Sequence, residues 1–347
     1  MTIESVKNYY GKVLASNKDL KTSACCATES FPQYIRDVLK DIHPEVISKF
    51  YGCGSPLPPE LAGKTVLDLG SGSGRDCFIL SKLVGPGGTV IGLDMTLEQL
   101  AIAKRHTGYH ADKFGYSRSN VEFRHGYIED LAEAGIQDDS IDIVVSNCVI
   151  NLSPAKEQVF SEIFRMLKPG GELYFSDVFA DRRIPGHLAR DPVLLGECLG
   201  GAMYVEDFRR MLAGVGCRDW RTVSRSEITL SDAAIEQKAG MIGFSSLTVR
   251  AFKLNLEDRC EDFGQVAYYL GTVPGHPHRF VLDDHHTFHS GKPMPVCGNT
   301  ASMLTDTRFA PHFNVVGDTK THYGLFGCGP KEAGSPGDGQ KPGGSCC

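Results

Sequence analysis

The chain has 347 residues, with 36 basic and 42 acidic side chains and 41% hydrophobic residues. This length suggests about two domains of roughly 150 residues each, and the apolar fraction is sufficient for a folded core. There is no apolar run of the roughly 20 residues that a membrane span needs, and the polar N-terminus lacks the apolar stretch of a secretory signal. The net charge of −6 disfavours nucleic acid as a partner. We therefore expect a soluble cytoplasmic enzyme that binds neither nucleic acid nor a membrane.

The first predicted elements in chain order are two helices between residues 31 and 50. Apolar residues recur there at helical spacing, and Pro44 divides the stretch because proline cannot continue a helix. Residues 52–64 are rich in Gly and Pro and indicate a connector. We predict that residues 1–60 form an N-terminal helical cap with cysteine-containing loops.

Five short apolar runs follow, separated by segments of helical length. Residues 154–167 carry the clearest helical pattern, with one apolar stripe that includes Phe160 and Ile163. Strands that alternate with helices imply right-handed crossovers and a parallel sheet. We therefore predict a doubly wound α/β domain over residues 61–180. The predicted strands are residues 65–69, 89–93, 121–124, 141–146 and 172–175.

The pattern becomes irregular after residue 180. A helix is predicted at 205–212, and strands that extend the sheet are predicted at 219–229 and 247–254. We divide the rest of the chain into a region at 181–255, a small C-terminal domain at 256–328, and a disordered Gly/Pro-rich tail at 329–347.

A glycine-rich loop between the first predicted strand and the next helix is the most informative segment. It reads Gly70-Ser-Gly-Ser-Gly-Arg75, and Asp68 precedes it by two residues. Glycines at such a turn let a ligand approach the backbone amides at the helix N-terminus. The ligand is either a dinucleotide or S-adenosylmethionine.

Three features favour S-adenosylmethionine. A dinucleotide fingerprint needs glycine at position 75, where this chain has arginine. Asp68 would repel a pyrophosphate but suits the ammonium group of a methionine. The turn at 168–171, Lys-Pro-Gly-Gly, is common in class I methyltransferases. Asp94 ends the second strand and can accept ribose hydroxyls, although NAD enzymes share that placement.

Twelve cysteines are unusual in a chain without an export signal. In a reducing compartment they are not expected to form a disulfide framework. No C-x-x-C pair occurs, which argues against a zinc ribbon or a thioredoxin-like motif. We expect most of them to be small buried hydrophobic residues, and the question is whether a subset meets in space. They are Cys25, Cys26, Cys53, Cys77, Cys148, Cys198, Cys217, Cys260, Cys297, Cys328, Cys346 and Cys347.

Several strings of the chain resemble the arsenite methyltransferases that use S-adenosylmethionine. They are YYGKVL near the start, YGCG at 51–54, LDLGSGSGRDC at 67–77, HGYIEDL at 125–131, SNCVINL at 146–152, GGELYFSDV at 170–178 and GECLGGA at 196–202. The resemblance covers residues 6–255 and leaves the C-terminal part uncovered. It implies a class I methyltransferase with a Rossmann-like doubly wound sheet, an appended arsenic-binding region within 181–255, and a small C-terminal domain.

The resemblance implies that Cys53, Cys148 and Cys198 bind trivalent arsenic. Arsenic(III) is thiophilic and takes up to three thiolates, as soft ligands select soft centres elsewhere. Cys148 follows the fourth predicted strand at the carboxyl edge of the sheet, where ligands bind in open α/β folds. Cys53 precedes the core and Cys198 follows it, each in a glycine-flanked loop. Cys25 matches the family's N-terminal redox cysteine, although the adjacent Cys26 is an alternative.

The resemblance also implies a set of cofactor-binding residues. The expected contacts are Gly70, Ser71, Gly72, Gly74 and Arg75 at the methionine end, with Asp68 beside them; Asp94 and Met95 at the ribose and adenine; Ile128 and Glu129 at the adenine edge; Asn147 beside the sulfonium; and Tyr51 near the cofactor.

The implied reaction is methyl transfer from S-adenosylmethionine to thiolate-bound arsenic, which detoxifies arsenic. Positioning supplies much of the rate, and no general base is needed because no proton leaves arsenic. The expected substrate is arsenite or methylarsenite, free or as a thiol conjugate. A thiol reductant such as glutathione or thioredoxin is the expected co-substrate. A disulfide among Cys25, Cys53, Cys148 and Cys198 is the expected intermediate, and we expect a monomer.

Two other functions remain open. The methyl acceptor could be a small organic molecule, in which case activity would survive the loss of Cys148. The chain could instead sequester arsenic without catalysis, in which case it would not bind S-adenosylmethionine. The vicinal pair Cys346 and Cys347 could relay arsenic, but a pair without function is favoured.

A histidine-rich segment near the C-terminus offers a metal-binding alternative. Its spacing matches no zinc motif, so we favour loop histidines without a metal. The residues are His276, His278, His285, His286 and His289, followed by Cys297.

Overall fold

The structure, a computed structural model, describes residues 31–50, 56–196, 198–230 and 232–327. Its main feature is an eight-stranded sheet in the order β3-β2-β1-β4-β5-β8-β7, with β6 paired to β5. β1 to β5 are parallel, whereas β8 runs antiparallel to both of its neighbours. The strands are β1 Thr65–Leu69, β2 Thr89–Asp94, β3 Val121–His125, β4 Ile141–Asn147, β5 Leu167–Ala180, β6 Met203–Tyr204, β7 Trp220–Glu227 and β8 Phe244–Phe252.

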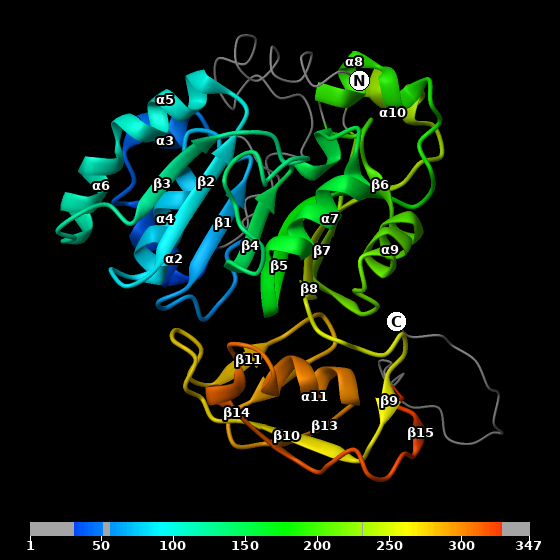
Figure 1. Ribbon diagram of the computed structural model, residues 1–347. Helices are drawn as coiled ribbons and strands as arrows, with labels where there is room; N and C mark the ends of the chain where they lie inside the picture. Colours follow the sequence, from blue (N-terminus) through cyan, green and yellow to red (C-terminus); the bar gives the residue numbers. More distant parts are fainter. Residues whose placement is uncertain (1–30, 51–55, 197, 231, 328–347) are drawn as a thin grey trace.

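Helices cover both faces of this sheet (Figure 1). Successive residues of β1 face opposite layers: Val66 packs in the core cluster that contains Phe78, and Leu67 packs in the cluster that contains Phe160. The period of two along the strand produces this alternation. One layer holds α2 Gln33–Leu39, α3 Pro44–Ser48, α4 Arg75–Val84, α5 Leu97–Arg105 and α6 Thr107–Phe114, and the other holds α7 Lys156–Met166 and α9 Val205–Gly214.

A smaller apolar cluster lies at the carboxyl edge of the sheet. It joins the end of β5, represented by Val178 and Ala180, to Leu194 and Ile235 from the segment between β5 and β8. Cys148 and Cys198 belong to the same cluster. The segment's elements are η5 Leu188–Arg190, α8 Pro192–Gly196 and α10 Ala233–Ala239, and η4 Ile150–Leu152 follows β4.

The C-terminal part forms a separate small core around Tyr269, Phe280 and Phe309. It packs at the end of the sheet opposite α8 and α10 (Figure 1). Three strands pair in the order β13-β10-β14, and β11–β12 and β9–β15 pair separately. The elements are β9 Glu261–Asp262, β10 Gln265–Tyr269, β11 Arg279–Val281, β12 Thr287–His289, β13 Pro293–Val296, α11 Gly298–Thr305, η6 Ala310–His312, β14 Phe313–Val316 and β15 Gly324–Leu325.

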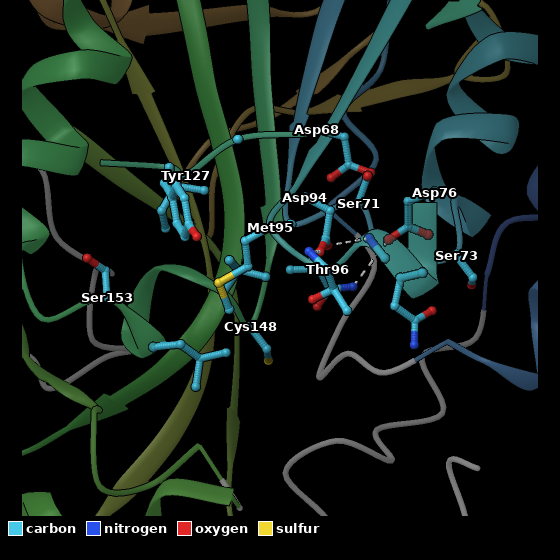
Figure 2. Close-up of a pocket in the computed structure, with 18 of the residues that line it drawn as sticks. Asp68, Ser71, Ser73, Asp76, Asp94, Met95, Thr96, Tyr127, Cys148 and Ser153 are labelled. Carbon is cyan, nitrogen blue, oxygen red and sulfur yellow. Dashed lines mark hydrogen bonds between the residues drawn. The ribbon is translucent and has the colours of Figure 1, made fainter. Parts of the chain in front are cut away.

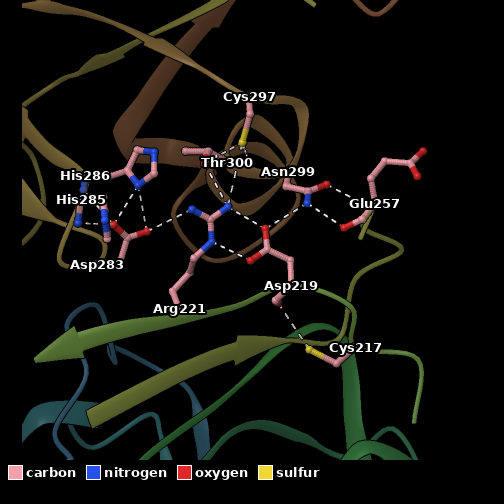
Figure 3. A network of polar contacts seen from close by, with 10 residues as sticks. All are labelled: Cys217, Asp219, Arg221, Glu257, Asp283, His285, His286, Cys297, Asn299 and Thr300. Atoms are coloured by element: carbon pink, nitrogen blue, oxygen red, sulfur yellow. Dashed lines mark hydrogen bonds and ion pairs between the residues drawn. The ribbon is translucent and has the colours of Figure 1, made fainter. Parts of the chain in front are cut away.

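Buried charges join this C-terminal part to the sheet. The carboxylate of Glu172 in β5 accepts a hydrogen bond from Arg250 in β8 and forms an ion pair with Arg308 of the C-terminal part. At the edge strand, the guanidinium of Arg221 lies between Asp219 and Asp283, as Figure 3 shows. Ion pairs of this kind fix orientation because each partner is costly to leave unpaired in a buried site.

The structure confirms the predicted strands of the sheet and the division of the first helical stretch before Pro44. β5 is longer than predicted at both ends. Its first residue, Leu167, pairs with Ile141 through a register irregularity, so the Lys-Pro-Gly-Gly turn is part of the strand. No helix among the described residues is long and apolar enough to cross a membrane.

Candidate active site

A cavity lies where the parallel strands end, at the carboxyl edge of the sheet (Figure 2). The space along its walls amounts to about 1160 Å³ with the adjoining open solvent included, so the cavity is accessible from outside. The predicted site residues that line it are Asp68, Gly70, Ser71, Gly72, Asp94, Met95, Ile128, Glu129, Asn147, Cys148 and Cys198. The predictions for Cys25, Cys26, Cys53, Tyr51, Cys346 and Cys347 lie outside the described residues.

The glycine loop is held in shape by the end of β2. The amides of Gly70 and Ser71 donate to the carbonyl of Leu93, at 2.8 and 3.0 Å. Gly70 has a φ of +73°, and a Cβ there would lie 2.3 Å from a methyl group of Val149. Glycine is therefore required both for the backbone conformation and for contact with the loop after β4.

Asp94 connects the glycine loop to the second strand. Its Oδ2 accepts the Gly72 amide at 2.8 Å, and its Oδ1 accepts the Thr96 amide at 2.8 Å. Burial raises the pKa of this carboxyl group, while the two backbone hydrogen bonds oppose the shift. The carboxylate is thus fixed at the cavity wall, where its remaining lone pairs can accept ligand hydroxyls.

Asp68 is a buried acid on the cavity wall at the end of β1. Burial and the neighbouring charge of Asp76 raise its pKa to about 8. The thiol of Cys77 donates to its Oδ2 at 3.2 Å, which gives this core cysteine a polar contact as well as a packing role. A cationic ligand group would stabilise the ionised form of Asp68.

Two predicted cofactor contacts, Gly74 and Arg75, do not line the cavity. Gly74 is the N-cap of α4, with a φ of +89°. The guanidinium of Arg75 pairs with Asp76 and lies 3.1 Å from the ring centroid of Phe50. Arg75 thus contacts two residues that line the cavity, Asp76 and Phe50, and its own contact with the cofactor stays a prediction.

Cys148 and Cys198 line the same cavity from different loops. Cys148 directly follows β4, and Cys198 follows α8. Both are nearly fully buried, and both have a left-handed backbone, with φ of +56° and +61°. A non-glycine residue in that region costs on the order of 1–3 kcal/mol and persists only when the surroundings enforce it. Such strain is concentrated at functional sites.

Of the two sulfurs, that of Cys148 takes part in a disulfide. The other described cysteines, Cys77, Cys217, Cys260 and Cys297, are buried thiols away from the cavity wall. A disulfide at a predicted arsenic ligand means that a reductant must act before this sulfur can bind a thiophilic atom.

Sequence reasoning missed several lining residues that follow strand ends. Ser153 donates to Glu129 Oε1 at 2.5 Å and so orients a predicted cofactor contact. Thr96 lies two residues after Asp94, and Tyr127 lies within the string that suggested Ile128. Their positions after strands could have identified them. Leu152 lies within the string at 146–152. Phe50 and Gln99 also line the wall, and no sequence pattern pointed to them.

Two of the five C-terminal histidines, His285 and His286, have acidic partners. His286 Nδ1 lies 2.8 Å from Asp283, and His285 Nδ1 lies 2.5 Å from Asp284. Within the described ranges, no group of three metal-binding side chains contains two of the five predicted histidines. Figure 3 shows Cys297 on the other side of Arg221, beside Thr300.

Comparisons with known proteins agree with this architecture. A family model described as a methyltransferase domain matches residues 60–216. A second one, described as the arsenite methyltransferase C-terminal domain, matches residues 263–334, which no recognised string had covered. The arsenite methyltransferase of Aquipseudomonas alcaligenes is 56% identical over 328 residues, which is 94% of each chain. The chain belongs to the arsenite methyltransferase family.

Other members of the family are similar over most of their length. The mouse arsenite methyltransferase is 46% identical over 311 residues, covering 89% of this chain and 82% of the mouse protein. The crystal structure of an arsenic(III) S-adenosylmethionine methyltransferase from Chlamydomonas reinhardtii is 51% identical, with a TM-score of 0.83. The match covers 86% of this chain and all of the algal chain. The two chains therefore share the class I methyltransferase fold over that length.

Proposed function

We propose that the protein transfers the methyl group of S-adenosylmethionine to trivalent arsenic held by cysteine thiolates. The observation that carries this proposal is the single cavity lined by Cys148, Cys198 and the methyltransferase glycine loop. Two soft sulfur ligands on strained backbone beside a cofactor site suit a thiophilic substrate. Membership of the arsenite methyltransferase family supports the same reaction.

The polar groups of the cavity fit S-adenosylmethionine. Ser71 Oγ and Gln99 Oε1 are buried on the wall without a hydrogen-bond partner among the described residues, so a polar ligand would satisfy them. Asp68 would hold the ammonium group, and Asp94 would accept the ribose hydroxyls. Met95 and Ile128 would contact the adenine. Bound there, the sulfonium supplies an electrophilic methyl group.

The arsenic side of the cavity needs alignment more than acid–base chemistry. The lone pair of arsenic forms the As–C bond while the C–S bond of the sulfonium breaks, and no proton is lost. No histidine lines the described part of the wall, which fits a reaction without a general base. Cys148 and Cys198, with Cys53 as third ligand, would fix the direction of the lone pair.

A thiol reductant completes the proposed cycle. Methylation oxidises arsenic by two electrons, and two thiolates return them by forming a disulfide. The disulfide at Cys148 supports this role, and Cys25 and Cys53 are the proposed partners in exchange. Glutathione or thioredoxin would then reduce the protein by attack of a thiolate. We propose that this occurs in the cytoplasm, with a monomeric enzyme and a small arsenical as substrate.

A product assay tests the proposal. Reduced protein is incubated with S-adenosylmethionine, glutathione and arsenite, and arsenic species are separated by chromatography. The parent is expected to form methylated arsenic, and Cys148→Ser and Cys198→Ser to form none. The control Cys217→Ser should remain active, because Cys217 packs in the core away from the cavity wall and its thiol donates to the Asp219 carbonyl. A parent that binds the cofactor yet leaves arsenite unmethylated would overturn the proposal in favour of an organic acceptor.

A further inference from the structure

Asn151 is buried three residues after Cys148 and is joined to the neighbouring strand. Its side-chain amide donates to Asp177 Oδ1 and to the Val178 carbonyl, both at 2.6 Å. Its backbone amide donates to Asp177 Oδ2 at 3.1 Å. The Cys148 amide donates to the Ser176 carbonyl at 2.8 Å. The loop after β4 is therefore fastened to the end of β5 at both Cys148 and Asn151.

The loop of Cys198 approaches the same residue. A Cβ on Gly201 would lie 2.2 Å from the backbone carbonyl oxygen of Asn151. Gly201 is not in the left-handed region, so the need for glycine here comes from the close approach of the two loops. Two residues later Met203 pairs with Phe179 of β5. Both cysteine loops are thus attached to β5, and they contact each other at Asn151 and Gly201.

Asp177 is fully buried, as is Asn151, and neither lines the cavity. A buried carboxylate is expensive unless directional hydrogen bonds need it. Asp177 accepts from Asn151 and from the Val178 amide, and the ammonium of Lys156 attracts it. Lys156 in turn donates to the Ser153 carbonyl at 2.8 Å, at the end of the same loop. The polar contacts of this carboxylate therefore hold the Cys148 loop in place, directly through Asn151 and indirectly through Lys156.

We propose that Asn151 and Asp177 are positioning residues that set the separation of the Cys148 and Cys198 sulfurs. This inference rests on the proposed function, because the separation matters only if one arsenic atom binds both sulfurs. The hydrogen bonds fix the Cys148 loop on β5, and the Asn151 carbonyl against Gly201 fixes the Cys198 loop relative to it. The pair acts through the two cysteines and does not contact the substrate.

Asn151→Ala and Gly201→Ala test the pair by different routes. The first removes the hydrogen bonds to Asp177, and the second keeps them but forces the loops apart. Thr248→Val is the matched control, because it removes a buried 2.8 Å hydrogen bond to Ser176 without changing the contacts of Asn151. Each reduced protein is titrated with S-adenosylmethionine and with arsenite, and the number of As–S bonds is measured by X-ray absorption.

Both loop variants are expected to bind arsenite at least tenfold more weakly, with fewer As–S bonds and a raised KM for arsenite. The cofactor affinity of both variants and all properties of the control should stay within twofold of the parent. If either loop variant binds the cofactor normally and keeps the parent's As–S number and arsenite affinity, the inference is overturned. A parent that binds the cofactor but no arsenite would instead refute the proposed function.

Discussion

At the scale of single residues, the ionisation of Asp68 is the feature most directly tied to ligand binding. Its folded pKa of about 8 lies above its ordinary value of 3.8, because burial and Asp76 favour the neutral acid. At pH 7 most of the empty protein therefore carries a proton on this group. A bound ammonium group would favour the carboxylate and lower that pKa.

We predict that S-adenosylmethionine binding at pH 7 releases a proton from Asp68 and that affinity rises as the pH increases from about 6 to 8. Isothermal calorimetry in two buffers of different ionisation enthalpy measures the proton release directly. Asp68→Asn should abolish the release and flatten the pH dependence. Equal apparent enthalpies in the two buffers for the parent would contradict this role of Asp68.

The cysteines show what could be predicted at this scale. The position of Cys148 after a strand identified it as a cavity residue, and a family resemblance was needed to select Cys198. The hydrogen bonds from Asn151 to Asp177 join residues far apart in the chain. No local pattern predicts such contacts, because they depend on the register of neighbouring strands.

At the scale of elements, the glycine loop and the loop after β4 depend on each other. Gly70 combines a φ of +73° with a contact to Val149, the residue after Cys148. The glycine loop and the loop that carries Cys148, the proposed cofactor and arsenic sides of the cavity, therefore share one packing contact. A change in the glycine loop should therefore alter the affinity for both ligands.

We predict that Gly70→Ala weakens the binding of S-adenosylmethionine and of arsenite, each by at least tenfold. Gly85→Ala is the matched control, because Gly85 has nearly the same φ of +72° but open space around its Cβ position. Comparison of the two variants distinguishes the effect of backbone strain, which both share, from the displacement of Val149, which only Gly70→Ala causes. Titrations of both ligands followed by fluorescence provide the measurement. Normal arsenite binding by Gly70→Ala would show that the two loops are not coupled.

Predictability differed among the elements. β1, β2 and β4 are buried parallel strands, so their apolar runs were visible in the sequence, whereas the edge strand β3 buries only Phe123. The strands after residue 256 have only two to five residues each, which is too short for a clear alternation. Their arrangement depends on packing around Tyr269 and Phe280 and not on local pattern.

At the scale of the whole molecule, Arg308 ties the C-terminal part to the methyltransferase core. It is buried, pairs with Glu172 at 2.5 Å, and donates to the Pro59 carbonyl at 3.0 and 3.1 Å. These partners are separated from it by more than a hundred residues, so no sequence pattern could reveal the contact.

Arg308→Met should lower the free energy of unfolding by about 3–5 kcal/mol, because it leaves Glu172 with one fewer cation and the Pro59 carbonyl without its donor. Arg279→Met, on the exposed face of β11, is the control and should change stability by less than about 0.5 kcal/mol. Urea unfolding measures both. A loss below about 1 kcal/mol in Arg308→Met would mean that this contact does not hold the C-terminal part to the sheet.

The central claim, that the methylated arsenic atom is the one bound by the protein's thiolates, is tested most directly by a single turnover. Reduced protein is loaded with one equivalent of arsenite, freed of excess, and mixed with S-adenosylmethionine carrying a ¹³C-labelled methyl group. We predict one labelled methyl per arsenic, formed on protein-bound arsenic, and none with Cys198→Ser although it still binds the cofactor. Label that stays on the cofactor in the loaded parent, or that appears on arsenic equally well with Cys198→Ser, would contradict the account.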